Sequence, residues 1–358
     1  MLTEIRKNEL LSVIRYNPSS KPNPIMVKVR SSSYLHSILN KSRIWYSKNI
    51  LSKSLKDKYR DNMQHFEMSD VEANCVDELR VNGIAVLENY FDENFIDEIH
   101  KKVDTLFMNL KIDKNGGYNI GHGRLKTLEG MSYEEISIVE ESVSMKDVLL
   151  SVPDTVGIAF NESFLKIVTN YFGFAPLHQV DVSRAFPHIP PVESSYFHKD
   201  SGNHEVLHIF VYLVDVDENG GPFCYIPRTH TNDAKSCAPM TNYDLGKNGA
   251  YGRISDEEIK KYYPESEWMP IKAKRGSVVI AHVNGLHKGP MWLGNDISKL
   301  NPRDIFQINF RSIKNKKSIK KSGKIYKNSI ETFTTLQRLF LDNYKIFEND
   351  NRIHSVNE

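Results

Sequence analysis

Apolar residues recur along the chain at two spacings, which predicts a helical part followed by a β-rich part. Residues 83–89 (GIAVLEN) have the pattern of a strand. Asp92 can then cap a helix in which apolar residues of 95–107 recur at helical spacing. Asn161 can cap a second helix that ends at Gly173. Both helices are therefore expected to turn one apolar side towards a core.

Short strands are predicted after Pro176. Residues 206–214 (VLHIFVYLV) are almost continuously apolar, which suits a strand buried on both faces. Helices followed by a run of short strands predict a mainly β fold with flanking helices, in the form of an antiparallel barrel or sandwich. The other predicted strands are residues 178–186, 223–226, 276–282 and 304–312, and further helices are expected within 34–44, 255–262 and 329–344.

Three regions follow from this pattern. Residues 1–66 are interrupted early by three prolines and read as a basic arm. Residues 67–315 form the expected globular domain, and residues 316–358 a basic linker followed by an amphipathic helix. The division predicts one large core with an appendage at each end.

The charge of the 358-residue chain is unevenly distributed. Its net charge is only +2, but residues 1–60 carry a net +10 and residues 311–327 a net +8, which leaves −16 for the rest. Basic segments can contact anionic partners, or they can be solvated lysines, and we favour solvated lysines. One alternative stays open, in which residues 314–327 help to hold an anionic substrate. No specific nucleic-acid partner is expected, and the oligomeric state is open.

Several protein classes are disfavoured by composition. No run of 18 or more apolar residues exists, so no transmembrane helix is expected. The start, MLTEIRKNEL, lacks the apolar region of a secretory signal. The three cysteines lie far apart without a CxxC pair, which disfavours a disulfide framework or a cysteine zinc site. We therefore expect a cytoplasmic protein.

Candidate chemistry centres on His198-Lys199-Asp200. On an extended segment the first and third residues share a face, so an imidazole and a carboxylate can bind one metal ion together. His287 follows a predicted strand and would complete a set of two histidines and one carboxylate, the facial triad of non-haem Fe(II) oxygenases. Spacing alone leaves competitors open. Asp200 can instead cap a turn, and His282, His204 and His208 compete as ligands.

The residues around this tripeptide carry a resemblance to a known family. From residue 196 the chain reads YFHKDSGNHEVLHIFVYLVDVDENGGPFCYIPRTH, and 276–279 reads GSVV before His287 and Arg303. The order of these motifs, with the strand and helix of 82–107, resembles the phytanoyl-CoA dioxygenase-like (PhyH) family of Fe(II)/2-oxoglutarate-dependent oxygenases. The resemblance spans roughly residues 75–313. It implies a double-stranded β-helix, also called a jelly roll or cupin-like core.

The resemblance also implies roles for particular residues. It gives Fe(II) to His198, Asp200 and His287. It implies that Arg303 binds the distal carboxylate of 2-oxoglutarate, because the planar guanidinium can bind a carboxylate bidentately. Further candidates are Gln179 and Asn309 near the cosubstrate, and Arg184 near a substrate that includes anionic options.

Two departures from the family pattern are visible. Arg228 stands where the family has a glycine, so a turn requiring positive φ would be strained. Fifteen residues separate His287 from Arg303, more than the family pattern suggests, and Arg311 is therefore the alternative partner for 2-oxoglutarate.

The activity implied is that of a dioxygenase that consumes O2, decarboxylates 2-oxoglutarate to succinate and hydroxylates a small-molecule metabolite. Related halogenases replace the metal-binding carboxylate with Gly or Ala, so Asp200 favours hydroxylation. Two alternatives stay open: a catalytically silent jelly roll acting as a binding module, and a cupin-type metal enzyme that does not use 2-oxoglutarate.

Overall fold

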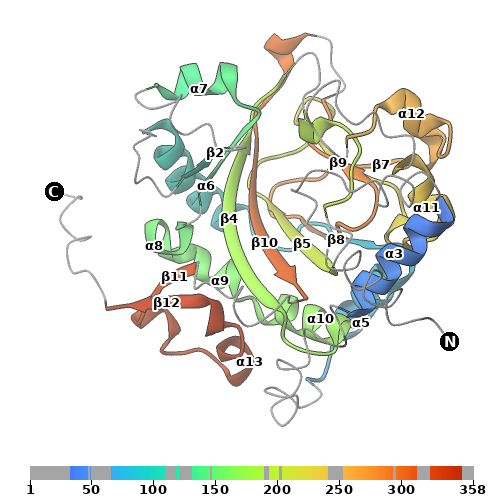
Figure 1. The fold of residues 1–358 in the computed structure, drawn as a ribbon. Helices are drawn as coiled ribbons and strands as arrows, with labels where there is room; N and C mark the ends of the chain where they lie inside the picture. The colour runs from blue at the N-terminus through green and yellow to red at the C-terminus, as the bar shows by residue number, and fades with distance from the viewer. Residues whose placement is uncertain are drawn as a thin grey trace, which may run out of the picture.

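A computed structural model describes residues 33–46, 49, 66–109, 118–120, 131–145, 147–188, 193–200, 204–240, 253–292, 296–312 and 323–348. Sheet dominates the centre of the fold and helices flank it, as the sequence predicts (Figure 1). The helices are α3 (Ser33–Tyr46), α5 (Asp70–Val81), α6 (Glu93–Met108), α7 (Tyr133–Val139), α8 (Val148–Ser151), α9 (Val156–Ala159), α10 (Glu162–Phe172), α11 (Ala234–Cys237), α12 (Asp256–Lys260) and α13 (Thr335–Arg338). The strands are β1 (Ile84–Leu87), β2 (Tyr118–Ile120), β3 (Ser142–Met145), β4 (Leu177–Ala185), β5 (Val206–Tyr212), β6 (Phe223–Tyr225), β7 (Met269–Ile271), β8 (Val278–His282), β9 (His287–Lys288), β10 (Arg303–Arg311), β11 (Gly323–Tyr326) and β12 (Tyr344–Phe347).

Two antiparallel sheets make up the body of the fold. The larger has the strand order β1-β8-β5-β10-β4-β3-β2, and the smaller has the order β7-β6-β9. The central strands β4, β5 and β10 pair over most of their length, with Asn309 of β10 directly opposite both Gln179 and His208. Directly opposite residues share a face, so this register decides which side chains point towards the smaller sheet.

The large sheet is buried on both faces. Phe306, Ile308 and Phe310 of β10 pack in one apolar cluster with residues of α6 and α10, such as Val103 and Phe164. On the other face, a second cluster includes residues of both sheets, among them Ile305, Phe210, Phe223, Tyr225 and Ile271. Burial on both faces explains why the sequence of β5 is almost continuously apolar.

The two long helices begin and end where the sequence predicts. The Asp92 side chain accepts a hydrogen bond from the Phe95 N–H at the start of α6. Asn161 does the same for the Phe164 N–H at the start of α10, and Gly173 ends α10 with φ 72°. Side-chain caps and a left-handed glycine stabilise helix ends that otherwise leave backbone groups unpaired.

The amphipathic helix expected over residues 329–344 is wrong. Its apolar residues are buried, but on short turns and the four-residue α13, which are followed by β12 pairing in parallel with β11. Thr334 and Gln337 form a capping box that starts a new helix in mid-segment, and Arg338 donates hydrogen bonds to the carbonyls of Ile330, Glu331 and Phe333. These side-chain contacts break the helical ladder that the apolar spacing predicted.

The turn at Arg228 has the positive φ that the family pattern led us to consider. Arg228 adopts φ 67°, the left-handed region, and its N–H donates to the Asn82 carbonyl at 2.8 Å. Left-handed backbone costs a residue with a side chain roughly 1–2 kcal/mol. The strain expected from Arg in place of glycine is therefore present.

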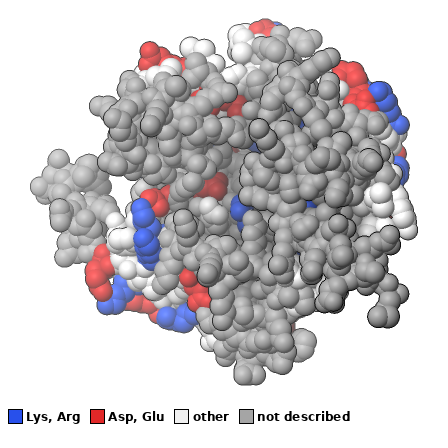
Figure 2. Space-filling view, in the orientation of Figure 1, with Lys and Arg blue, Asp and Glu red and all other residues white. Residues whose placement is uncertain are grey.

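Charged side chains of both signs lie side by side over β11, β12 and α12 (Figure 2). Lys324 pairs with Asp147 at 2.6 Å and Lys327 with Glu348 at 3.1 Å. The basic residues of 1–32 and 313–322 fall outside the described residues, so the proposed contact of 314–327 with a substrate is not addressed. Within the described part of the chain, no helix is both long enough and apolar enough to cross a bilayer.

Candidate metal and cosubstrate site

His198, Asp200 and His287 meet in the fold although 89 positions separate His198 from His287 along the chain. His198 and His287 pair across an antiparallel bridge, in which each backbone N–H donates to the other carbonyl at 2.8 and 3.0 Å. The Asp200 N–H donates to the Val283 carbonyl at 2.9 Å. These backbone bonds hold the segment of His198 and Asp200 at a fixed register against Val283 and β9, the edge strand of the small sheet.

One ligand atom from each of the three side chains lies within 4.8 Å of the others. His198 Nε2 is 3.3 Å from Asp200 Oδ1, and His287 Nε2 is 3.7 Å from Asp200 Oδ2. The other ring nitrogens face carbonyls, with His198 Nδ1 2.8 Å from the Tyr196 oxygen and His287 Nδ1 3.0 Å from the Gly285 oxygen. Nδ1–H donation to a carbonyl leaves Nε2 with the lone pair that a metal needs. Two imidazoles and one carboxylate thus fit an Fe(II) ion.

The charge state of the cluster also suits a cation. Partial burial would raise the pKa of Asp200, but His287, His198 and His208 lower it well below its ordinary range. Burial lowers the pKa of His287 to about 3 and that of His208 to about 4. The Asp200 carboxylate is therefore charged and the His287 imidazole neutral, the protonation states that metal ligands require.

The competing histidines are placed differently. His208 of β5 lies beside the cluster, with Nδ1 4.0 Å from Asp200 Oδ2. The His282 ring instead stacks near Tyr171 and His230, at centroid distances of 5.8 and 5.2 Å. Among the residues that the structure describes, His198, Asp200 and His287 are the one group with metal-binding geometry.

Arg303 opens β10 close to this cluster and is 6% exposed. Its Nη1 donates to the Gly221 carbonyl at 2.8 Å, whereas the buried Nε has no hydrogen-bond partner among the described residues. A Cβ built on Gly289 would lie 3.3 Å from Nη1 and 3.2 Å from the Phe223 ring, and that ring lies 5.5 Å from the His287 ring. Arg303 therefore lies one aromatic ring away from a candidate ligand.

A bound carboxylate would suit the buried guanidinium of Arg303, whose Nε is unpartnered among the described residues. Burial lowers the pKa of Arg303, because removal from water disfavours the charged guanidinium. The edge formed by Nε and Nη2 matches the bidentate geometry of a carboxylate. Arg311, the alternative, is exposed at the opposite end of the strand.

Gln179 and Asn309 lie on the same face of the large sheet as Arg303. Asn309 is opposite Gln179 on one side and His208 on the other, so one row of polar side chains runs across β4, β10 and β5. The Asn309 amide donates to Asp181 at 3.2 Å and accepts from Gln307 at 2.8 Å. The structure thus brings both residues to the inner face, with Asn309 lying between Gln179 and His208.

Arg184 lies on the opposite face of the sheet. Its Nε donates to Asp304 Oδ1 at 2.7 Å, and its Nη2 donates to Asp304 and to Asp104 Oδ1, the latter at 2.7 Å. The guanidinium also lies 4.8 Å from the centre of the Phe107 ring. Two carboxylates and the helix core occupy this arginine, so a structural role replaces the substrate contact that the sequence suggested.

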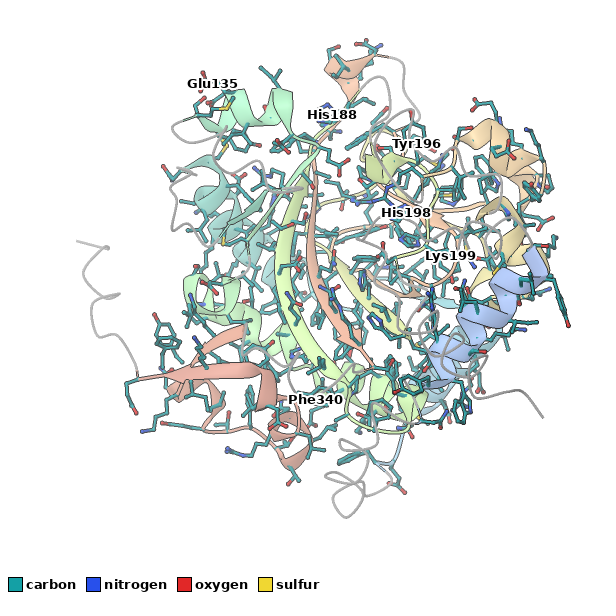
Figure 3. All side chains as sticks on the ribbon, in the orientation of Figure 1. Glu135, His188, Tyr196, His198, Lys199 and Phe340 are labelled. Carbon is teal, nitrogen blue, oxygen red and sulfur yellow. The ribbon has the colours of Figure 1, made fainter. Side chains whose placement is uncertain are left out.

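Lys199 and Phe223 are neighbours of the site that the sequence analysis did not single out. Lys199 stands between two candidate ligands, so strand alternation alone predicts that it points away from them. In Figure 3, His198 lies in the region of the small sheet and Lys199 on the side of α3 and α11. Phe223 carries no sequence signal, because its place between Arg303 and His287 depends on the packing of two sheets.

The sequence matches the family described as "Phytanoyl-CoA dioxygenase (PhyH)" over residues 79–296. No curated protein matches the chain. Among solved structures it is similar to the "non-heme alpha ketoglutarate dependent epimerase SnoN from nogalamycin biosynthesis", with 13% identity over 67% of this chain and 82% of that chain and a TM-score of 0.44. It is also similar to EvdO2 from Micromonospora carbonacea var. aurantiaca, with 13% identity over 68% of this chain and 92% of that chain and a TM-score of 0.45. A third similar structure is EctD from S. alaskensis, solved with 2-oxoglutarate and 5-hydroxyectoine. It has 15% identity over 68% of this chain and 78% of that chain, and a TM-score of 0.45.

Proposed function

Because the chain belongs to the phytanoyl-CoA dioxygenase (PhyH) family, we propose that it is a non-haem Fe(II)/2-oxoglutarate-dependent dioxygenase that hydroxylates a small-molecule metabolite. One observation carries the proposal. Two imidazoles and a carboxylate converge within 4.8 Å, and nearby lies the buried Arg303, whose Nε has no hydrogen-bond partner among the described residues. A metal ion and a dicarboxylate would satisfy both halves of this arrangement.

In this proposal each side chain has a defined task. His198, Asp200 and His287 hold Fe(II) through Nε2, one carboxylate oxygen and Nε2. The Nε–Nη2 edge of Arg303 pairs with the distal carboxylate of 2-oxoglutarate, while Gly221 orients the guanidinium. When bound, Fe(II) and 2-oxoglutarate supply activation of O2, with decarboxylation to succinate and oxygen transfer to the substrate.

The remaining residues orient the bound groups and exclude water. Phe223 separates Arg303 from His287 and makes the space between them apolar on that side. Gln179 and Asn309 offer amide groups beside the cosubstrate, from the row opposite His208. Asp200 is the carboxylate that related halogenases replace with Gly or Ala, and its presence supports hydroxylation as the outcome.

The same proposal includes the wider architecture. The apolar cluster between the large and small antiparallel sheets supports a double-stranded β-helix as the core. Residues 67–315 would form this oxygenase domain, preceded by a basic arm at 1–66 and followed by residues 316–358. The match over residues 79–296 lies within the proposed domain.

Succinate release tests the activity. The full chain, with Fe(II), O2 and 2-oxoglutarate, is incubated with a panel of metabolites, and succinate is quantified against a sample without substrate. We expect at least one compound to raise succinate release and to gain one oxygen atom by mass spectrometry. Asp200→Ala should abolish both signals. Turnover of a compound without O2 or 2-oxoglutarate would instead favour the cupin-type enzyme, and the absence of metal binding would favour the silent module.

A further inference from the structure

The side chain of Lys199 leaves the metal cluster and ends in a set of three oxygen acceptors. Its Nζ donates to the Thr229 carbonyl at 2.8 Å, to Asn232 Oδ1 at 3.2 Å and to Ser236 Oγ at 3.4 Å. An ammonium has three N–H donors, so these contacts use all of them. The acceptors belong to residues 229–236, the turn leading into α11 and α11 itself.

The acceptors are themselves held in place. Asn232 is 1% exposed, adopts φ 52° and donates through its amide to the His230 carbonyl at 2.9 Å. The Ser236 N–H donates to Asp233 Oδ1 at 2.7 Å, which caps α11. Lys199 therefore fixes the segment that carries His198 and Asp200 to a rigid turn.

Helix α3 supports the far side of the same turn. Ser37 Oγ donates to the Asn232 carbonyl at 2.6 Å, and the Asn40 amide lies 3.9 Å from Cys237 Sγ. Asn232 thus receives Lys199 on its side chain and α3 on its backbone. This helix lies outside the residues that match the family.

We infer that Lys199 is a positioning residue for the metal site, and that α3 supports this function through Asn232. The inference rests on the proposed function, because it concerns the same metal. The bridge between His198 and His287 fixes backbone register, but the placement of Nε2 and the carboxylate also depends on the segment not rotating about that bridge. Three hydrogen bonds from the residue between the two ligands oppose such rotation.

Calorimetric titration with Mn(II), which does not oxidise in air, measures the effect in the full chain. Lys199→Met keeps the apolar stem and removes the three donors. We expect it to weaken Mn(II) binding by roughly 10-fold or more, the effect typical of groups that orient metal ligands. Ser37→Ala should weaken binding by a few-fold, less than Lys199→Met.

Lys324→Met is the matched control. Lys324 lies on β11, away from the cluster, and the variant removes its ion pair with Asp147. It should lower the unfolding midpoint without changing Mn(II) affinity. If Lys199→Met resembles this control, Lys199 is merely structural and the inference is wrong. If Lys199→Met does not fold, unchanged Mn(II) affinity in Ser37→Ala and in Asn232→Gly refutes it. Failure of the wild type to bind Mn(II) would instead refute the metal site, and both proposals with it.

Discussion

The sharpest consequence of the site concerns Arg303, because its buried Nε has no hydrogen-bond partner within the described part of the chain. We predict that Arg303→Met loses 2-oxoglutarate binding without losing stability. Truncating one partner of a buried hydrogen-bonded charge pair costs about 2–5 kcal/mol. At about 1.4 kcal/mol per tenfold, the Kd for 2-oxoglutarate should rise by about 30-fold or more. Removal of this buried cation should leave the free energy of unfolding without ligand unchanged or higher.

Thermal and urea unfolding with Mn(II), with and without 2-oxoglutarate, measure both effects. At a concentration about 100 times the wild-type Kd, a ligand stabilises the folded state by about 2.7 kcal/mol. A 30-fold weaker variant at the same concentration should gain less than about 1 kcal/mol. Arg311→Met is the matched control, since Arg311 is exposed at the other end of β10, and it should behave as the wild type. Loss of 2-oxoglutarate binding in Arg311→Met, with retention in Arg303→Met, would refute the assignment.

Three further predictions follow from buried or strained groups. Arg184→Met leaves Asp304 buried without its cation and should lower the free energy of urea unfolding by about 3–5 kcal/mol, with the KM for 2-oxoglutarate unchanged; equal stability would contradict the ion-pair account. Arg228→Gly relieves the left-handed backbone at φ 67° and should raise the unfolding free energy by up to about 1 kcal/mol; a loss would show that the Arg228 side chain matters more than its backbone. Burial lowers the pKa of His178 to about 3, so the unfolded chain binds a proton that the folded protein does not, and stability should fall as pH drops from about 6.5 towards 3, by about 1.4 kcal/mol per unit for this residue. His178→Asn keeps an acceptor for the Tyr344 hydroxyl. It should reduce the slope of unfolding free energy against pH by about 1.4 kcal/mol per pH unit, the contribution of one proton. An unchanged slope would contradict this account of His178.

Local chemistry made much of the fold predictable from the sequence. Asp92 and Asn161 announce helix starts, and Gly173 announces a helix end, because capping depends on side chains close in sequence. The strand at 206–214 was predictable because burial on both faces leaves an unbroken apolar run. The prediction of a helix over residues 329–344 failed because the apolar spacing there fits a helix. The contacts of Arg338 and the pairing of β12 with β11 decide the structure instead, and they depend on the folded chain.

The candidate site was predictable only in part for a related reason. Strand alternation puts Gln179 and Arg184 on opposite faces, but it does not say which face lies on the side of the candidate site. The register resolves this, because Ala185 lies opposite Arg303 and Arg184 opposite Asp304. The roles of Phe223 and of the acceptors around Lys199 arise from segments that meet only in the folded chain.

The central claim is that His198, Asp200 and His287 hold Fe(II) beside bound 2-oxoglutarate. Anaerobic absorbance of the full chain tests it most directly, since chelation of Fe(II) by 2-oxoglutarate produces a metal-to-ligand charge-transfer band. We predict that the band appears only when Fe(II) and 2-oxoglutarate are both added, and that His198→Ala and His287→Ala lose it while His282→Ala keeps it. Absence of the band in the wild type, or its persistence in His198→Ala and His287→Ala, would contradict the account.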